Sequence, residues 1–286
     1  CIVGGIDLLS SSEFAAYCNE VRKKETCEYY VNYKDKVRRD IAAQSMTRPL
    51  HVEEVISLGK QHHICPFEIS AYVGKKANVI IADYFHVLSP SIQEYFFTRI
   101  NKKLDDCILI FDEAHHLPSK CRDLLSTTLS TLSLSAAQKE NIRFGFEFND
   151  ELKRLENILF KLGHNVTEEI LVKKEDLKFD PVFITSLKFA GEQVLVKQKR
   201  SFLSIIGFFL EEWNGPDEGF VRILTKKHMK AGNAHIQIMY NCLDPSFILS
   251  DLQVHSMILM SGTLMPLTMY QDLLNLKKSV HVEYLS

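Results

Sequence analysis

Two adjacent carboxylates, Asp112 and Glu113, follow directly on a run of apolar residues in the stretch CILIFDEAHHL, residues 107–117. The apolar run predicts a short buried strand, and neighbouring side chains that leave a strand point in different directions. One carboxylate could therefore hold a magnesium ion through its water shell while the other orients an attacking water molecule. Phosphoryl transfer needs both tasks, because its catalysis consists mostly of positioning and charge neutralisation.

The elements that must position these carboxylates are two short apolar runs, NVIIADYF (78–85) and CILIFDE (107–113), with a predicted helix between them. Strand, helix and strand with near-continuous apolar strands is typical of a parallel sheet covered on both faces. In open α/β sheets ligands bind beyond the carboxyl ends of the strands, where Asp112 and Glu113 lie. The pattern therefore favours a Walker B strand of a nucleotide-driven motor over a strand that merely ends in a polar turn.

A Walker B strand works together with a phosphate-binding loop, but the pattern G-x-x-x-x-G-K-[ST] occurs nowhere in the chain. The Gly-Lys pair in VGKKAN (73–78) has no upstream partner glycine and no hydroxyl, so it is predicted to be a helix end. The chain as written cannot cradle ATP phosphates by the usual route. Either the activity is lost or the loop precedes Cys1, and a start at cysteine rather than methionine suggests an excerpt or a processed protein.

Composition bounds the class of protein. The 286 residues are 46% hydrophobic and 24% charged, with a net charge of -2, which suits a globular protein of one to three domains and excludes a wholly basic nucleic-acid binder. No signal peptide is evident, and no apolar run approaches the roughly 18 residues of a membrane span. Seven cysteines are an odd number and too few for a disulfide scaffold, which favours a reducing cytosolic or nuclear compartment.

The pattern of apolar and polar residues divides the chain into four predicted blocks. Residues 1–70 are cysteine-rich with helical spacing, and residues 71–119 carry the two apolar strands. Residues 120–235 are mainly helical in pattern, and residues 236–286 return to strands in AHIQIMYNCL and HSMILMSGTL. We therefore expect a parallel-sheet core that is interrupted by a helical insertion.

Four of the seven cysteines precede the predicted parallel sheet: Cys1, Cys18, Cys27 and Cys65. In a reducing compartment a cysteine cluster suggests a metal before a disulfide. Their wide, uneven spacing differs from the paired C-x-x-C units of a zinc ribbon. On spacing alone an iron–sulfur cluster, zinc and no metal all remain open.

Cations and aromatic rings are interleaved in CEYYVNYKDKVRRD, residues 27–40. Between residues 20 and 50 there are eight basic and five acidic residues, a local charge of +3. Cations for phosphates and rings for base stacking suit a single-stranded nucleic acid, whereas the alternative is a solvated helix whose tyrosines face the core. The candidate residues are Tyr29, Tyr30, Tyr33, Lys34, Lys36, Arg38 and Arg39.

Taken together, these stretches resemble the XPD family of iron–sulfur DNA helicases, of superfamily 2. FDEAHHL (111–117) is similar to the DEAH box of that family, and CPFEISAYVGKKANVIIADYFHVL (65–88) to its segment from the last cluster cysteine into the next motor strand. CLDPS (242–246) and SMILMSGTLMP (256–266) are similar to its return to the motor and its third helicase motif. The order of the parts also matches, with a cysteine-rich insert before the DEAH box and a helical insert, the Arch, after it.

The resemblance implies an α/β fold: part of a RecA-like parallel-sheet motor domain with an iron–sulfur cluster insert and a mainly helical Arch insert. The implied domains are the cluster domain at 1–70, motor domain 1 at 71–119, the Arch at 120–235 and the return to motor domain 1 at 236–286. It also implies that the four cysteines named above, Cys1, Cys18, Cys27 and Cys65, ligate a 4Fe-4S cluster.

The resemblance further assigns roles at the two helicase motifs. Asp112 would bind magnesium, Glu113 would activate the water, and His115 would link ATP hydrolysis to movement. The SGT motif would couple the nucleotide state to DNA, where the alternative is a plain strand-to-helix turn. That motif consists of Ser261, Gly262 and Thr263.

The implied function is an ATP-dependent helicase that opens duplex DNA from 5′ to 3′, acts as a monomer on single-stranded and forked DNA, and serves nucleotide excision repair. Its compartment would be the archaeal cytoplasm and nucleoid, or the nucleus in a eukaryote; the short cysteine domain is closer to the archaeal form. The competing hypotheses are a zinc-stabilised nucleic-acid-binding module without enzymatic activity and a DinG-like helicase.

Two positions depart from the family pattern near the DNA path. Phe67 stands where the family commonly has tyrosine, and Ala71 where it has a basic residue. Base stacking can survive at Phe67, but the phosphate contact at Ala71 is lost. The Walker A loop and the second motor domain also have no counterpart in the sequence.

Overall fold

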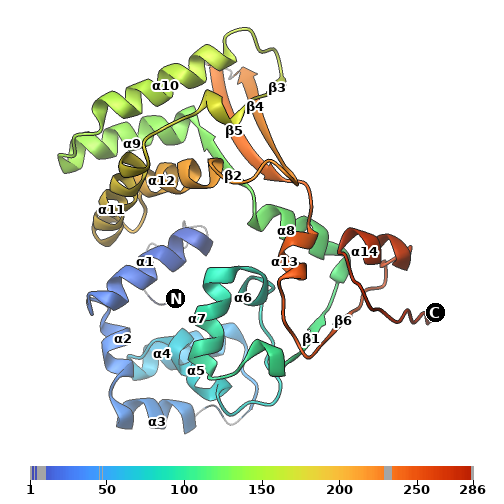
Figure 1. Ribbon diagram of the computed structural model, residues 1–286. Coiled ribbons are helices and arrows are strands. Elements are labelled where there is room, and N and C mark those ends of the chain that lie inside the picture. The colour runs from blue at the N-terminus through green and yellow to red at the C-terminus, as the bar shows by residue number, and fades with distance from the viewer. Residues whose placement is uncertain are drawn as a thin grey trace. The chain divides into compact units, whose positions relative to one another are not determined.

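The computed structural model describes residues 2, 4, 11–44, 46, 48–228 and 234–284 (Figure 1). The contacts between residues divide this part of the chain into two compact units. Unit 1 holds residues 21–124 and 245–284, and unit 2 holds residues 11–20 and 125–244. No helix among the described residues is long and apolar enough to cross a membrane.

Unit 1 is a mixed α/β unit in which many short helices accompany a two-stranded parallel sheet. Its helices are the end of α1 (Ser11–Lys23), α2 (Glu28–Tyr33), α3 (Lys36–Gln44), α4 (Val52–His62), α5 (Pro66–Gly74), α6 (Phe85–Leu88), α7 (Pro90–Ile100), α8 (Leu117–Leu124), α13 (Ser246–Ser250) and α14 (Leu267–Leu273). The 3-10 turns η1 (Leu104–Asp106) and η2 (Ala114–His116) flank the first strand. The strands are β1 (Ile108–Phe111) and β6 (Ser256–Leu259).

The parallel pair joins the two apolar runs that the sequence predicts as strands on either side of the insertion. β1 and β6 pair in parallel from Ile108 opposite Ser256 to Phe111 opposite Leu259 (Figure 1). Both strands are apolar on both faces, which is the composition of a parallel sheet. The prediction of strands in 107–113 and in HSMILMSGTL is thus confirmed, and their carboxyl ends lie side by side. The prediction that both faces of the sheet are covered is wrong for the described residues, because Ile108 and Ile110 on one face of β1 are 60% and 62% exposed.

The prediction of a strand in NVIIADYF is wrong. Residues 78–83 belong to no strand, and Tyr84 leads directly into α6. The side chains of Val79 and Ile81 are 81% and 97% exposed, so no partner strand or helix covers them among the described residues. A strand requires a neighbour for its backbone hydrogen bonds, and β propensity alone does not supply one.

The cysteine-rich part of unit 1 has a small helical core of its own. Ala42, Ile64 and Ile69 are fully buried together, beneath α3, α4 and α5. Helix α5 begins with Pro66 at its first position, where a missing N–H costs nothing. A buried carboxylate on α5, that of Glu68, connects this helix to the end of α1 and to α7.

Glu68 is 1% exposed and lies between two arginines. The Arg22 Nε and Arg99 Nη1 atoms are 3.4 Å and 3.2 Å from its carboxylate oxygens, and the Tyr95 hydroxyl donates to it at 3.1 Å. Burial raises the pKa of Glu68, against the lowering effects of Arg22 and of the Tyr95 hydrogen bond. The carboxylate thereby ties α5 to α1 and to α7.

Unit 2 combines four helices with a four-stranded antiparallel sheet of order β2-β5-β4-β3. Its helices, after the start of α1, are α9 (Thr131–Phe144), α10 (Asn149–Gly163), α11 (Pro181–Gln198) and α12 (Phe202–Trp213), with the 3-10 turn η3 (Lys174–Asp176). Its strands are β2 (Thr127–Ser130), β3 (Glu169–Leu171), β4 (Phe220–His228) and β5 (Ala234–Cys242). The helical character of this region is confirmed. Strand β5 coincides with AHIQIMYNCL, which the sequence predicts as a strand, whereas β2, β3 and β4 are strands that the helical prediction did not contain.

Strand β4 escaped prediction because a charge occupies one of its inward positions. Arg222 is 5% exposed and donates to the carbonyl oxygens of Trp213, at 2.8 Å, and Gly215, at 2.9 Å. Its guanidinium lies over the ring of Tyr240, 4.6 Å from the centroid. A buried arginine breaks the apolar alternation by which a strand is recognised from sequence.

Helices α11 and α12 pack backbone to backbone in the core of unit 2. A Cβ atom at Gly191 would lie 2.5 Å from the backbone nitrogen of Ser204, closer than any real side chain approaches. The N-terminus of α12 is held by Glu140, whose carboxylate accepts hydrogen bonds from the Ser201 hydroxyl at 2.9 Å and the Leu203 amide at 2.8 Å. The buried carboxylate thus accepts hydrogen bonds from donors at the start of α12 that have no acceptor within the helix.

Candidate functional site

The candidate site lies where β1 and β6 end, because the backbone hydrogen bonds of the parallel pair continue past both strands. The amide of Met260 donates to the Phe111 carbonyl at 3.0 Å, and the amide of Ala114 donates to the Met260 carbonyl at 3.0 Å. These bonds hold the residues that follow each strand beside one another. The DEAH sequence and the SGT sequence, remote in the chain, therefore form one local structure within unit 1.

The turn after β1 exposes both carboxylates to solvent. Glu113 is the N-terminal cap of η2 and adopts the left-handed backbone conformation, with φ of 49°. The Asp112 Oδ1 atom accepts a hydrogen bond from the Glu113 amide at 2.9 Å. Both side chains are exposed, so a hydrated cation and a water molecule can reach them.

Ser261 connects the carboxylate of Glu113 to the imidazole of His115. The Ser261 hydroxyl donates to Glu113 Oε2 at 3.0 Å and lies 2.7 Å from His115 Nδ1. His115 Nδ1 is itself 3.3 Å from Glu113 Oε2. The Thr263 amide donates to the Ser261 hydroxyl at 3.2 Å, so the loop after β6 is held to the same group. The structure thus brings together the predicted residues of both motifs.

Gly262 lies between these two hydroxyl residues without a contact of its own. A Cβ atom there would meet no heavy atom within 4 Å. The position is therefore open to an approaching group on this side of the loop.

Tyr84 is a residue of this site that sequence reasoning missed. Its hydroxyl donates a hydrogen bond to the backbone carbonyl oxygen of Asp112, and its ring meets the Phe111 ring edge-on, with 5.7 Å between centroids. Burial, followed by the charges of Asp112 and Glu113, raises the pKa of Tyr84, so the hydroxyl stays protonated as a donor. The sequence signal was hidden because Tyr84 ends a run predicted to be a strand.

Two of the four predicted cluster ligands begin neighbouring helices. Cys27 precedes α2 and Cys65 precedes α5, and the Cys65 amide donates to the Tyr29 carbonyl at 3.0 Å. Cys18 is half-buried in the portion of α1 that belongs to unit 2, and Cys1 lies outside the described residues. The Cys65 side chain makes no capping hydrogen bond to the nine-residue helix that it begins. The described residues themselves gather no group of three or more metal-binding side chains.

Several of the predicted nucleic-acid residues contact one another. Tyr30 has the Arg22 guanidinium 4.9 Å and the Lys34 ammonium 5.5 Å from its ring centroid. Lys34 also forms an ion pair with Glu25. Tyr29 stacks on His63, with 6.4 Å between ring centroids.

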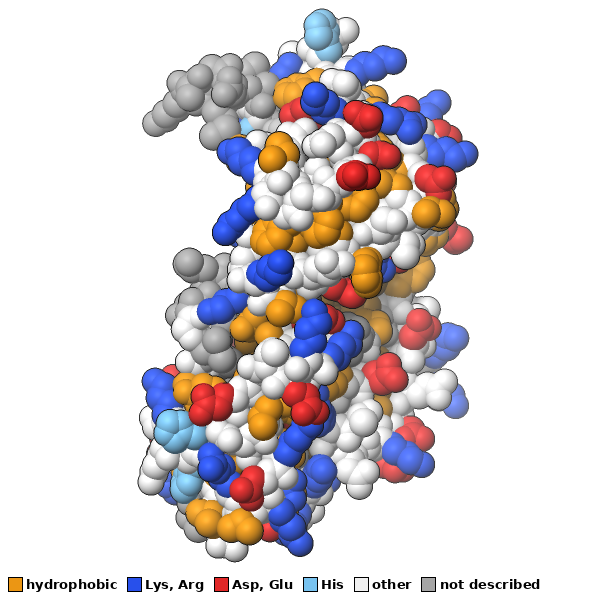
Figure 2. Space-filling view, turned by 90° about the vertical axis from the view of Figure 1, so that its left-hand side faces the viewer, with side chains coloured by type: hydrophobic (Ala, Val, Ile, Leu, Met, Phe, Trp, Pro, Cys, Tyr) orange, Lys and Arg blue, Asp and Glu red, His pale blue; other side chains and the backbone are white. Residues whose placement is uncertain are grey.

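The remaining cations lie on α3, and Phe67 lies on α5. Arg39 sits over the Tyr72 ring at 4.8 Å, whereas Lys36 is exposed and Arg38 half-buried. Phe67 is 40% exposed and stacks on Tyr95, with the planes 12° apart. Lys and Arg side chains are interspersed with Asp and Glu over the face drawn in Figure 2, so this face as a whole is not basic.

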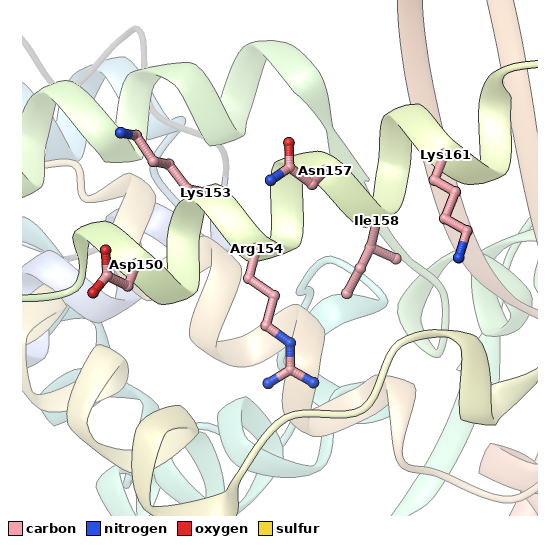
Figure 3. Close-up of a pocket in the computed structure, with 6 residues that line it drawn as sticks. All are labelled: Asp150, Lys153, Arg154, Asn157, Ile158 and Lys161. Atoms are coloured by element: carbon pink, nitrogen blue, oxygen red, sulfur yellow. The ribbon is translucent and has the colours of Figure 1, made fainter.

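A groove of about 320 Å³ runs along the outer face of α10 in unit 2 (Figure 3). It is lined by Asp150, Lys153, Arg154, Asn157, Ile158 and Lys161. Arg154 turns from this helix toward the following segment, where it lies 5.1 Å from the Phe179 ring centroid. None of the predicted site residues lines the groove, so it is separate from the candidate site.

Comparison with known proteins gives the class of the chain. Residues 1–134 match the model of the DEAD_2 family. The general transcription and DNA repair factor IIH helicase subunit XPD of Dictyostelium discoideum is 20% identical, over 96% of this chain and 44% of that protein. These matches, with the DEAH and SGT sequences at the ends of two parallel strands, make the chain similar to part of the helicases of superfamily 2. More particularly, the chain is XPD-like.

Other helicases of the same kind are also similar. The regulator of telomere elongation helicase 1 homolog of Caenorhabditis briggsae is 28% identical, over 56% of this chain and 15% of that protein. The Fanconi anemia group J protein homolog of Gallus gallus is 23% identical, over 92% of this chain and 27% of that protein. The chain therefore spans less than half the length of each of these relatives.

Proposed function

We propose that this chain is the part of an ATP-dependent DNA helicase that carries the hydrolytic carboxylates and joins them to the SGT loop. The observation that carries the proposal is the hydrogen-bonded set of Glu113, Ser261 and His115, which links the ends of two parallel strands. Such a set suits a motor, because a displacement of the carboxylate during hydrolysis also displaces the loop after β6. A plain polar turn would need no such link between remote motifs.

Each residue then has a defined task. Asp112 would hold a hydrated magnesium ion, which would supply positive charge for the phosphates, and Glu113 orients the attacking water and accepts its proton. His115 and Ser261 transmit the position of Glu113 to Thr263, and Gly262 leaves room for a neighbouring group. The sequence contains no Walker A pattern, so the proposal assigns no phosphate-binding loop to the residues of this chain.

The finer assignments rest on the resemblance to XPD. We assign a 4Fe-4S cluster to Cys1, Cys18, Cys27 and Cys65, and its binding would brace the helical residues 1–70 as a cluster domain. Residues 120–235 would form the Arch between two parts of a RecA-like motor, at 71–119 and 236–286.

The DNA-contacting surface is assigned on the same basis. The rings and cations of α2 and α3, together with Phe67, would follow a single strand as forked DNA parts. These residues are Tyr29, Tyr30, Tyr33, Lys34, Lys36, Arg38 and Arg39. Movement from 5′ to 3′, a monomeric state, a role in nucleotide excision repair, and an archaeal or nuclear compartment belong to the same proposal. A DinG-like helicase would share the cluster and the motor.

The test is the change Glu113→Gln in the full protein. The amide keeps the shape of the side chain and removes the base, so ATP turnover should be abolished while nucleotide and DNA binding persist. The matched control is Glu94→Gln on α7, an exposed carboxylate in the same unit, which should leave turnover unchanged. Near-normal ATP hydrolysis in Glu113→Gln would refute the assignment.

A further inference from the structure

The backbone between the two carboxylates is in a conformation that needs support. Glu113, with φ of 49°, lies in the left-handed region that favours glycine and strains other residues. Such a conformation persists only where the surroundings hold it, and it occurs often at functional sites. At Glu113 the orientation of the preceding peptide decides where the carboxylate points.

Tyr84 holds that peptide from outside the strand pair. Its hydroxyl donates to the Asp112 carbonyl, which is the oxygen of the peptide joining Asp112 to Glu113. The same peptide donates its N–H to Asp112 Oδ1 at 2.9 Å. Both ends of this one peptide are therefore fixed, one by a side chain of the turn and the other by Tyr84.

Tyr84 is itself rigidly placed. Asp83 Oδ1 accepts the Phe85 amide at 3.0 Å, and the Tyr84 carbonyl accepts the Leu88 amide at 2.8 Å, so the start of α6 is fixed on both sides of the tyrosine. Leu88 is 1% exposed, which anchors the far end of α6. The edge-on contact with Phe111 then holds the ring over the end of β1.

We propose that Tyr84 is a positioning residue for ATP hydrolysis: its hydroxyl fixes the peptide between Asp112 and Glu113 and so aims the Glu113 carboxylate at the attacking water. This inference rests on the proposed function. Tyr84 contacts no reacting atom, and it acts through the backbone of the turn. The ring contact with Phe111 contributes to the stability of the fold, whereas the hydroxyl orients the peptide that precedes Glu113.

The two contributions separate in the variant Tyr84→Phe, which keeps the ring and removes only the hydroxyl. In the full protein we expect kcat for ATP hydrolysis to fall about tenfold, the effect of one hydrogen bond on a reacting geometry, with KM for ATP unchanged. The thermal unfolding midpoint should stay at the wild-type value. The matched control, Tyr270→Phe on α14, removes a tyrosine hydroxyl of the same unit and should leave kcat unchanged.

A double variant shows whether the hydroxyl acts through Glu113. With Glu113→Gln already present, Tyr84→Phe should not lower the residual single-turnover rate further, because residues that act as one unit are not additive. A tenfold loss that persists in this background, an unchanged kcat in Tyr84→Phe, or a loss accompanied by a higher KM and a lower unfolding midpoint would each overturn the inference. If Glu113→Gln itself hydrolyses ATP normally, the proposed function fails instead.

Discussion

Replacing Gly191 by alanine should destabilise unit 2, although alanine is the better helix former. The added Cβ would lie 2.5 Å from the Ser204 nitrogen and 2.8 Å from its Cα, where ordinary contact begins at 3.4 Å, so the two helices would have to separate by about 0.9 Å. Overpacking destabilises a protein by up to about 3 kcal/mol, and we expect the upper value here because backbone atoms cannot move aside as a side chain can. The higher helix propensity of alanine offsets about 1 kcal/mol of this, so the free energy of unfolding of unit 2 should fall by about 2 kcal/mol.

Trp213 makes this loss measurable. It is the one tryptophan of the chain and is fully buried in unit 2, so its fluorescence during urea unfolding reports on that unit. Gln193→Ala, an exposed change on the same helix, serves as the control and should shift the stability by less than about 0.5 kcal/mol. Adding Ser204→Ala removes the hydroxyl but not the backbone, so it should not restore Gly191→Ala. Full restoration, or a Gly191→Ala variant as stable as wild type, would refute the backbone contact.

Two further predictions concern a buried carboxylate and a cluster ligand. Glu140→Ala should lower the free energy of unfolding by about 2 kcal/mol, because the buried Leu203 amide loses its hydrogen-bond acceptor. Because burial raises the pKa of Glu140 in the folded state, its carboxyl contributes most stability below the unfolded pKa and loses that contribution as pH rises through the folded pKa. The urea midpoints of wild type and Glu140→Ala should therefore diverge as pH falls below neutrality, and convergence would contradict the assignment. Cys27→Ser in the full protein should bleach visible absorbance and lower iron content while the motor stays folded; unchanged iron would exclude Cys27, and a colourless wild type containing zinc would exclude the cluster.

The strand ends of the candidate site could be predicted because their signals are local. An apolar run that stops at Asp112 and Glu113 predicts a strand with a polar end, and HSMILMSGTL predicts a second strand. The hydrogen bonds of Ser261 to Glu113 and His115 confirm that the two motifs meet. Composition, order and spacing were sufficient for this part.

The rest depended on partners that no local pattern reveals. Tyr84 ends a run whose β propensity is high, and only the absence of a pairing strand within the described residues frees it to reach the Asp112 carbonyl. Arg222 is buried in β4 because two backbone carbonyls, of Trp213 and Gly215, and two rings surround it, all supplied by other segments. Glu68 is buried for a similar reason, between arginines from α1 and α7. In each case tertiary contacts override the usual preference of the residue type.

The way unit 2 closes on itself bears on how the chain folds. Ile108 and its partner Ser256 are 148 residues apart, a long loop to close before the parallel pair can form. The ends of unit 2, however, are joined to each other, since Thr127 pairs with Tyr240. If unit 2 folds first, only the 15 residues between Phe111 and Thr127 and the 15 between Tyr240 and Ser256 remain to be closed.

Shortening the flexible loop from 147 to 30 residues lowers the entropic cost of loop closure by roughly 1.4 kcal/mol, about a factor of ten in the chance of encounter. Early pairing of β2 with β5 would thus bring the two chain ends of unit 2 together, and with them the strands of the DEAH and SGT motifs. A long insertion in the middle of a motor is then no obstacle to its assembly, provided that the insertion begins and ends at the same place.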